Sequence, residues 1–188
     1  MREPFYTSHT AVEERILGSV LVARPVVLEA GCGRTTRLVR YRHRIRRLVG
    51  VDLDAAAGEQ NRALDEFLPA DAGGPLPFAA ASFDVVYANF VVEHLPRPAV
   101  AFREWRRLLT PGGSLVLITS NLSNPLMRVT HALPQRPMCR SNTVSALDRD
   151  LTRAGFAARR VSGVAMRAGE RLLPAERRST LVAWYQAA

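Results

Sequence analysis

VVLEAGCGRT, residues 26–35, is the stretch that decides the fold of this chain. Its first five residues form a short apolar run that contains Glu29, which indicates a buried strand ending beside an acidic residue. Gly31 and Gly33 follow in a turn, and glycine lets a ligand approach the backbone closely. A short helix is expected from about Thr35, and exposed N–H groups there favour a ligand with carboxylate character. Because open parallel sheets bind ligands at the carboxyl ends of their strands, this turn is the first candidate site.

A second acidic residue, Asp52, ends the next predicted strand. It follows Glu29 by 23 residues, close to the offset of about 20 at which a carboxylate accepts hydrogen bonds from ribose hydroxyls in nucleotide-binding sheets. A dinucleotide fingerprint would also need glycine at position 36, where this chain has Thr36. The turn and the acid together therefore predict a nucleotide-binding edge that lacks the pyrophosphate motif.

Apolar runs alternate with amphipathic stretches along the chain, which predicts βαβ units and a mostly parallel sheet buried on both faces. Strands are expected at residues 26–30, 48–52, 67–70, 83–89, 114–120, 156–164 and 180–186. Helices are expected at residues 11–23, from 35, at 55–64, from Pro98 and at 143–154. Residues 121–142 are rich in Asn, Ser and Pro, which indicates a loop. Trp105 and Trp184 have apolar neighbours and are predicted to lie in the core.

The composition is that of an ordinary globular domain. The 188 residues suit one domain, with 47% hydrophobic and 23% charged residues. No apolar run approaches the ~18–20 residues that span a bilayer, and the polar start lacks the apolar core of a signal peptide, so we expect a cytoplasmic protein. Cys32 and Cys139 are the only cysteines, and no Cys or His pair has metal-site spacing. Neither a disulfide framework nor a metal site is expected.

The formal net charge of +9 is typical of proteins that bind polyanions, but all 26 basic residues are arginine, which a genomic coding bias also produces. One cluster stands out, formed by Arg37, Arg40, Arg42, His43, Arg44, Arg46 and Arg47. A solvated helix end and loop would have the same composition. Binding of nucleic acid is therefore an open but less favoured interpretation.

In chain order, further motifs resemble those of the class I S-adenosylmethionine-dependent methyltransferases, from about Val26 to Gln186. They comprise Glu29–Gly33, Gly50–Asp54, Ala70–Ala72 with Pro75–Phe78 and Ser82–Asp84, Asn89–Leu95, Arg107–Gly113 and Ala154–Phe156. The resemblance implies one α/β domain over residues 1–188, doubly wound, with helices on both faces. Its seven-stranded, mostly parallel sheet would have the order 3-2-1-4-5-7-6 with strand 7 antiparallel. Residues 1–24 would form an N-terminal helix and lid segment, in which Phe5 and Tyr6 would cover the cofactor.

The resemblance also implies that the chain binds S-adenosylmethionine. The glycine turn would surround the methionine part, Asp52 would hold the ribose hydroxyls, Leu53 would pack near the adenine and Asp71 would contact its amino group. The full set of implied cofactor-binding residues is Glu29, Ala30, Gly31, Cys32, Gly33, Asp52, Leu53, Asp71, Ala72, Asn89 and Phe90. Two features depart from the family: Thr35 replaces a third glycine, and the 121–142 segment is shorter than in relatives that carry a lid there.

Methyl transfer depends mainly on aligning the acceptor with the methyl carbon. His94 is the candidate general base for a hydroxyl acceptor, because histidine titrates near neutrality; the alternative is that it only caps or packs the strand end. A small-molecule acceptor is favoured, since the chain has no extra module for a macromolecule. The alternatives are methylation of RNA or protein, suggested by the arginine cluster, and a non-catalytic binding module, suggested by Thr35 and the short loop.

Overall fold

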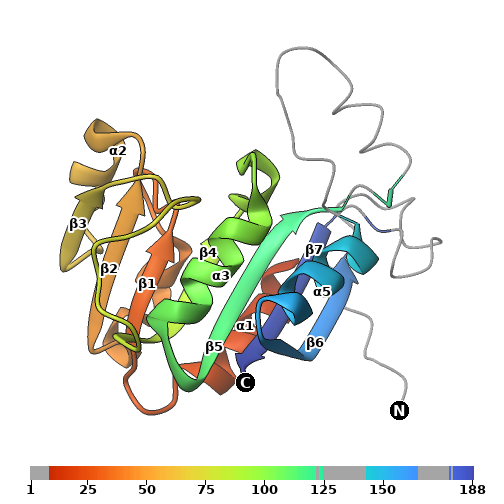
Figure 1. Cartoon of the computed structure of the whole chain (residues 1–188). Helices are drawn as coiled ribbons and strands as arrows, with labels where there is room; N and C mark the ends of the chain where they lie inside the picture. Colours follow the sequence, from red (N-terminus) through yellow and green to blue (C-terminus); the bar gives the residue numbers. More distant parts are fainter. Residues whose placement is uncertain (1–8, 122, 125–142, 165–177, 179) are drawn as a thin grey trace.

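The computed structural model describes residues 9–121, 123–124, 143–164, 178 and 180–188 (Figure 1). The strands are β1 (Val26–Ala30), β2 (Arg47–Asp52), β3 (Glu66–Pro69), β4 (Phe83–Asn89), β5 (Leu109–Ser120), β6 (Phe156–Val164) and β7 (Thr180–Ala187). The helices are α1 (His9–Val20), α2 (Ala55–Glu59), α3 (Pro98–Leu108) and α5 (Val144–Arg153), with the 3₁₀ helices η1 (Arg37–Arg44) and η2 (Val92–His94). None of the helices in these ranges has the length and apolar character needed to cross a membrane.

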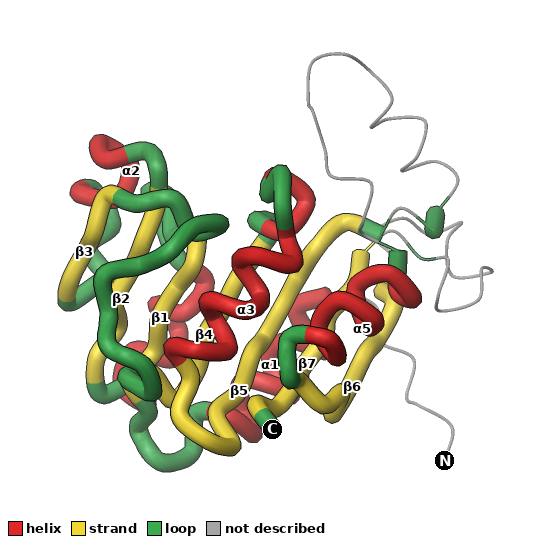
Figure 2. Tube along the Cα trace, viewed as in Figure 1, coloured by secondary structure: helices red, strands yellow, loops and turns green. Residues whose placement is uncertain are grey.

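The strands form one seven-stranded sheet in the order β3-β2-β1-β4-β5-β7-β6. Neighbouring strands from β3 to β5 are parallel, whereas β7 runs antiparallel to both β5 and β6. Helices α3 and α5 cover one face, and α1 covers the other (Figure 2). The predicted fold class is confirmed, including the strand order and the antiparallel seventh strand.

The core lies on both faces of the sheet, with β1 at its centre. Every residue of β1 is buried. Leu28 belongs to the apolar cluster that contains Trp105 of α3, and Val27 belongs to the cluster that contains Leu17 of α1. Burial of one such side chain contributes roughly 1.5–3 kcal/mol to stability. Trp105 is fully buried, as predicted, whereas Trp184 is only half-buried.

The helix expected over residues 55–64 is much shorter in the structure. Only Ala55–Glu59 is helical, and Gln60 forms the C-cap. Gly58 packs closely against β3, where a Cβ at this position would lie 1.9 Å from the Phe67 ring. After Glu59 the N–H groups of Gln60 and Asn61 donate to the carbonyls of Ala57 and Gly58, three residues back, and the chain leaves the helix there.

The starts of η1 and β5 also differ from the residues that the sequence predicts. The helix expected from about Thr35 is the 3₁₀ helix η1, whose N-cap Thr36 accepts the Leu38 N–H through Oγ1 at 3.0 Å. The fifth strand begins at Leu109 rather than at Ser114, because Leu109 pairs with Phe83 ahead of a register shift in β4.

Most of the arginine cluster makes contacts within the chain. Arg37 pairs with Glu13, Arg42 with Asp65, Arg47 with Glu66 and, more loosely, Arg40 with Glu14; Arg44 donates to the Gly18 carbonyl. An arginine that already holds a carboxylate offers less attraction to a phosphate backbone. The pairing favours the interpretation of this cluster as a solvated protein surface.

Candidate functional site

A cleft of about 410 Å³ opens at the carboxyl ends of β1 to β4, the upper edge of these strands in Figure 1. It is lined by Gly31, Asp52, Leu53, Asp71, Ala72, Asn89, Phe90, Val91, His94, Leu95 and Pro96. Its volume falls in the range of ~300–1,000 Å³ common for small-molecule sites. A larger hollow of about 510 Å³ lies at the opposite edge, beside Pro25 and Gly112. We assign the site to the carboxyl edge, because ligands of open parallel sheets bind there.

The glycine turn forms one wall of this cleft. Gly31 and Gly33 have φ values of +71° and +50°, which only glycine adopts readily. A Cβ on Gly31 would lie 2.4 Å from Val91 Cγ2, so glycine here also makes room for the segment after β4.

The amide groups of Gly31, Cys32 and Gly33 are not free for a ligand. Gly31 and Cys32 both donate their N–H to the Val51 carbonyl, at 2.8 and 3.0 Å. Gly33 donates its N–H to Asp52 Oδ2 at 2.8 Å. The end of β2 therefore accepts hydrogen bonds from all three of these amides, which fixes the turn against β2.

Asp52 lines the cleft, and each oxygen of its carboxylate accepts a hydrogen bond from a backbone amide. Its Oδ2 accepts from Gly33, and its Oδ1 accepts the Asp54 N–H at 2.9 Å. A carboxylate can accept about four hydrogen bonds, so each oxygen retains acceptor capacity. Next to it, the Leu53 side chain is 75% exposed at the rim. This pair presents a fixed acceptor for hydroxyl groups beside an apolar surface for a flat ring.

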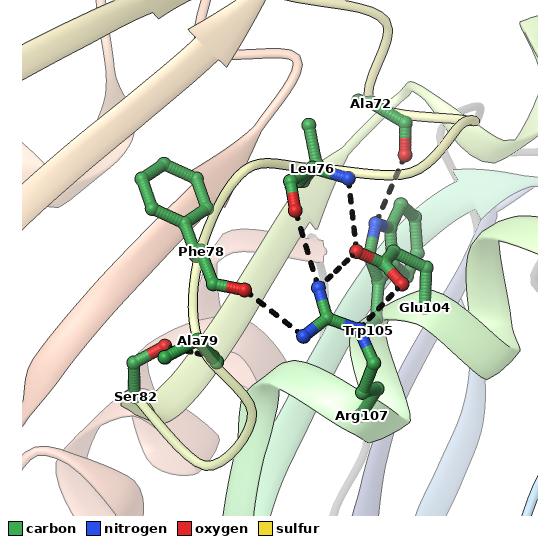
Figure 3. Close-up of polar contacts among 8 residues, drawn as sticks. All are labelled: Ala72, Leu76, Phe78, Ala79, Ser82, Glu104, Trp105 and Arg107. Atoms are coloured by element: carbon green, nitrogen blue, oxygen red, sulfur yellow. Dashed lines mark hydrogen bonds and ion pairs between the residues drawn. The ribbon is translucent and has the colours of Figure 1, made fainter.

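Asp71 and Ala72 form the opposite wall, on the loop between β3 and β4. Asp71 is exposed, and its Oδ1 accepts the Gly73 N–H at 2.8 Å. Trp105 of α3 anchors the neighbouring residue, because its Nε1–H donates to the Ala72 carbonyl at 3.0 Å (Figure 3).

Two charged residues of α3 hold the rest of this loop (Figure 3). Glu104 Oε1 accepts the Leu76 N–H at 2.9 Å, and Arg107 donates to the carbonyls of Phe78 and Leu76 at 2.9 and 3.1 Å. Arg107 also pairs with Glu104 at 2.6 Å, and this contact lowers the pKa of the Glu104 carboxyl. The loop that carries Asp71 is thus fixed to α3, a helix whose inner face is buried against the sheet.

Asn89 and Phe90 lie where β4 ends. Asn89 Oδ1 is buried, and no hydrogen-bond partner for it lies among the described residues. Phe90 has a φ of +54°, a left-handed conformation that costs a bulky residue about 1–3 kcal/mol. Its N–H donates to the Ile118 carbonyl at 2.7 Å. An unsatisfied buried acceptor beside a strained residue is characteristic of a ligand site.

His94 and Glu93 have different surroundings. His94 is exposed and lines the cleft. Glu93 is buried and accepts from Thr119 Oγ1 at 2.9 Å and from Ser120 Oγ at 3.0 Å, so it ties η2 to β5. His94 is therefore the residue of this pair that a ligand in the cleft can reach.

Glu29 lies behind the glycine turn rather than in the cleft. Its side chain is buried and accepts from Thr36 Oγ1 at 2.6 Å, while Oε2 has no partner among the described residues. Burial raises the pKa of this carboxyl to about 8, and nearby Glu13 and Asp52 add to the rise. Glu29 is consequently neutral over most of the physiological pH range.

Seven of the eleven residues expected to bind a cofactor line the cleft, namely Gly31, Asp52, Leu53, Asp71, Ala72, Asn89 and Phe90. Glu29, Ala30, Cys32 and Gly33 form the strand end and turn beneath it. Cys32 packs over Gly50, and burial raises the pKa of its thiol to about 12, so the thiol is not a nucleophile. Phe5, Tyr6 and residues 125–142 lie outside the described residues.

Val91 and Leu95 of the Asn89–Leu95 motif also line the cleft, whereas sequence reasoning missed Pro96 as a lining residue and Asn61 as a support of the turn. Pro96 directly follows that motif, so extending the motif by one residue would have found it. Within the described part of the chain, no group of three or more His, Cys, Asp or Glu side chains could hold a metal ion.

Residues 28–117 match the family model of a methyltransferase domain. The chain is 30% identical over 124 residues to a malonyl-[acyl-carrier protein] O-methyltransferase of Enterobacter lignolyticus. The aligned region covers 62% of this chain and 49% of that protein. It is 32% identical over 136 residues to a trans-aconitate 2-methyltransferase of Methylobacterium radiotolerans, covering 69% and 52%. The chain thus spans about half the length of these curated relatives.

The fold also resembles solved structures. An S-adenosylmethionine-dependent methyltransferase from Mesorhizobium loti superimposes with a TM-score of 0.72 at 22% identity, over 94% of this chain and 98% of that one. A likeness at this identity concerns the fold, and it agrees with the strand order described above.

Proposed function

Because the chain belongs to the class I S-adenosylmethionine-dependent methyltransferase family, we propose that it binds S-adenosylmethionine in the cleft at the carboxyl ends of β1 to β4 and transfers its methyl group to a small organic acceptor. The observation that carries this proposal is the carboxylate of Asp52, fixed by two backbone amides beside the exposed Leu53.

The chemistry of the cleft fits the parts of this cofactor. The ribose hydroxyls would donate to the remaining acceptor sites of Asp52, and the adenine would pack on Leu53 with its amino group toward Asp71. The ammonium group of the methionine part is a hydrogen-bond donor. Asn89 Oδ1 is a buried acceptor that has no donor among the described residues, so the ammonium group could supply one. Filling that acceptor would remove a penalty of roughly 1–3 kcal/mol.

The bound cofactor supplies a methyl group on a sulfonium, which is already a good leaving group. The protein residues would then act mainly by holding the acceptor in line and excluding water. For a hydroxyl acceptor, His94 carries the one imidazole among the described residues that line the cleft, and it would take up the hydroxyl proton.

The preference for a small acceptor rests on two considerations. The printed names of two relatives refer to malonyl-[acyl-carrier protein] and trans-aconitate as their substrates. In addition, the intramolecular pairing of most of the arginine cluster weakens the case for RNA. A protein acceptor and a non-catalytic binding module are the remaining alternatives. Methyl transfer to any acceptor would exclude the binding module.

The test is transfer of a labelled methyl group from S-adenosylmethionine to a panel of carboxylic acids, phenols, amines, short RNAs and proteins. Turnover with a small acceptor supports the proposal, and turnover with RNA alone would replace it by the RNA alternative. Cofactor binding without turnover on any class would favour the binding module.

A further inference from the structure

Asn61 lies two residues after the end of α2 and contacts the glycine turn from behind. It is 5% exposed. Its Nδ2 group donates to the carbonyls of Cys32 and Gly33, both at 3.2 Å, and its Oδ1 accepts the Ala63 N–H at 3.3 Å. The side chain thus uses both donors and its acceptor, and both donors serve the wall of the cleft.

Gly33 is consequently held through both of its polar backbone groups. Its N–H donates to Asp52 Oδ2, and its carbonyl accepts from Asn61. The other oxygen of Asp52 accepts from Asp54. The turn, the carboxylate and the start of α2 therefore form one hydrogen-bonded unit, in which a shift of Gly33 moves a donor that orients Asp52.

We propose that Asn61 is a positioning residue, which acts through Gly33 to aim the Asp52 carboxylate into the cleft. The inference rests on the proposed function, in which Asp52 holds the ribose hydroxyls of the cofactor. Asn61 does not touch the cleft, because the turn lies between them. Its effect is to preorganise the wall, so that binding does not have to order the turn.

The chemistry of the position requires a carboxamide. Two carbonyls must receive donors while one N–H needs an acceptor, and among short side chains only asparagine provides all three groups. Alanine would leave both carbonyls without this donor. Serine would restore one donor at most, so the Gly33 exchange rate and the Kd of Asn61→Ser should lie between those of the wild type and Asn61→Ala.

The test compares the wild type with Asn61→Ala, Asn61→Ser and the control Ser114→Ala. The control removes a half-buried hydrogen bond from Trp184 Nε1, 3.1 Å long. Ser114 lies beside the hollow at the opposite edge of the sheet, away from the cleft. Two quantities are measured well below the unfolding temperature of every variant: amide hydrogen exchange at Gly33 without ligand, and the Kd for S-adenosylmethionine by calorimetry.

We expect Asn61→Ala to speed Gly33 exchange and to raise the Kd at least tenfold, with Asn61→Ser intermediate and Ser114→Ala within twofold of the wild type. A purely structural Asn61 would lower the unfolding temperature of the variant and leave the Kd of the folded protein unchanged, which overturns the inference. If the wild type itself does not bind, the proposed function fails together with the cofactor role of Asn61. Gly33 exchange then still reports whether Asn61 holds the turn.

Discussion

Replacing Glu29 with glutamine should make the protein more stable at alkaline pH. Burial raises the pKa of Glu29 from 4.5 to about 8, so the folded state keeps a proton that the unfolded chain releases above pH 4.5. The stability contributed by this proton is fully present below pH 4.5 and is lost as the pH rises toward 8. At about 1.4 kcal/mol per pKa unit, the loss is at most about 5 kcal/mol. Glutamine mimics the neutral acid and has no proton to lose.

The assay is urea unfolding of wild type and Glu29→Gln at pH 5, 6, 7 and 8.5, because the titration of groups that do not interact with Glu29 cancels in the difference. The variant should be close to the wild type at pH 5 and more stable by at least about 1 kcal/mol at pH 8.5. Glu104→Gln serves as a control whose effect on stability should have the opposite pH dependence. The pKa of Glu104 is lowered by Arg107, so its contribution is present above pH 4.5 and is lost on acidification. A difference between Glu29→Gln and wild type that does not change with pH would refute the assignment of a buried neutral acid.

Three other substitutions test the cleft. Gly31→Ala should cost about 2–4 kcal/mol in urea unfolding, because the new Cβ meets Val91 at 2.4 Å and φ is +71°; full stability would contradict this geometry. Trp105→Phe should cost about 1–3 kcal/mol and weaken cofactor binding, because the Ala72 carbonyl loses its donor; unchanged binding would show that α3 does not position that wall. His94→Ala should lower kcat for a hydroxyl acceptor by roughly 10²–10⁴-fold and leave the cofactor Kd unchanged, whereas unchanged turnover would remove His94 as the base.

The strands of the sheet were the most predictable part of the fold. β1, β4 and β6 occupy the predicted residues. For β1 and β4 the reason is that central strands buried on both faces are continuous apolar runs with clear ends. β6 is an edge strand with several exposed residues, and its start was located from Gly155, which follows α5. The strand order followed from the resemblance to a family, and the structure bears it out. The end of α2 was mispredicted, because helical periodicity continues to Leu64, whereas the chain turns at Gln60 and Asn61 through hydrogen bonds to Ala57 and Gly58.

The site was predictable at the level of motifs but not of contacts. Asp52 and Leu53 could be located from spacing and resemblance. By contrast, the hydrogen bond between Gly33 and Asp52 joins residues 19 apart and depends on the register of β1 against β2. The same dependence hides Asn61, which belongs to no motif, and it explains why the turn amides are not free.

The burial of Glu29 illustrates a further limit. An acidic residue at a strand end suggests a ligand contact, but its partner here is Thr36, seven residues later on the far side of the turn. The arginine cluster is a similar case, since its partners Glu13, Asp65 and Glu66 lie on other elements. In both cases the charge of the site depends on side chains that only the tertiary fold brings together.

The most direct test of the central claim is calorimetric titration of the wild type, Asp52→Ala and the control Asp150→Ala with S-adenosylmethionine and with its demethylated product. Asp150 is a partly buried aspartate of α5 that does not line the cleft. We expect saturable one-site binding of both ligands to the wild type and to the control. The Asp52→Ala variant should bind at least 100-fold more weakly, or about 2.7 kcal/mol, because hydrogen bonds to a charged acceptor are lost. A wild type that binds neither ligand, or an Asp52→Ala variant that binds both as tightly as the wild type, would contradict the account.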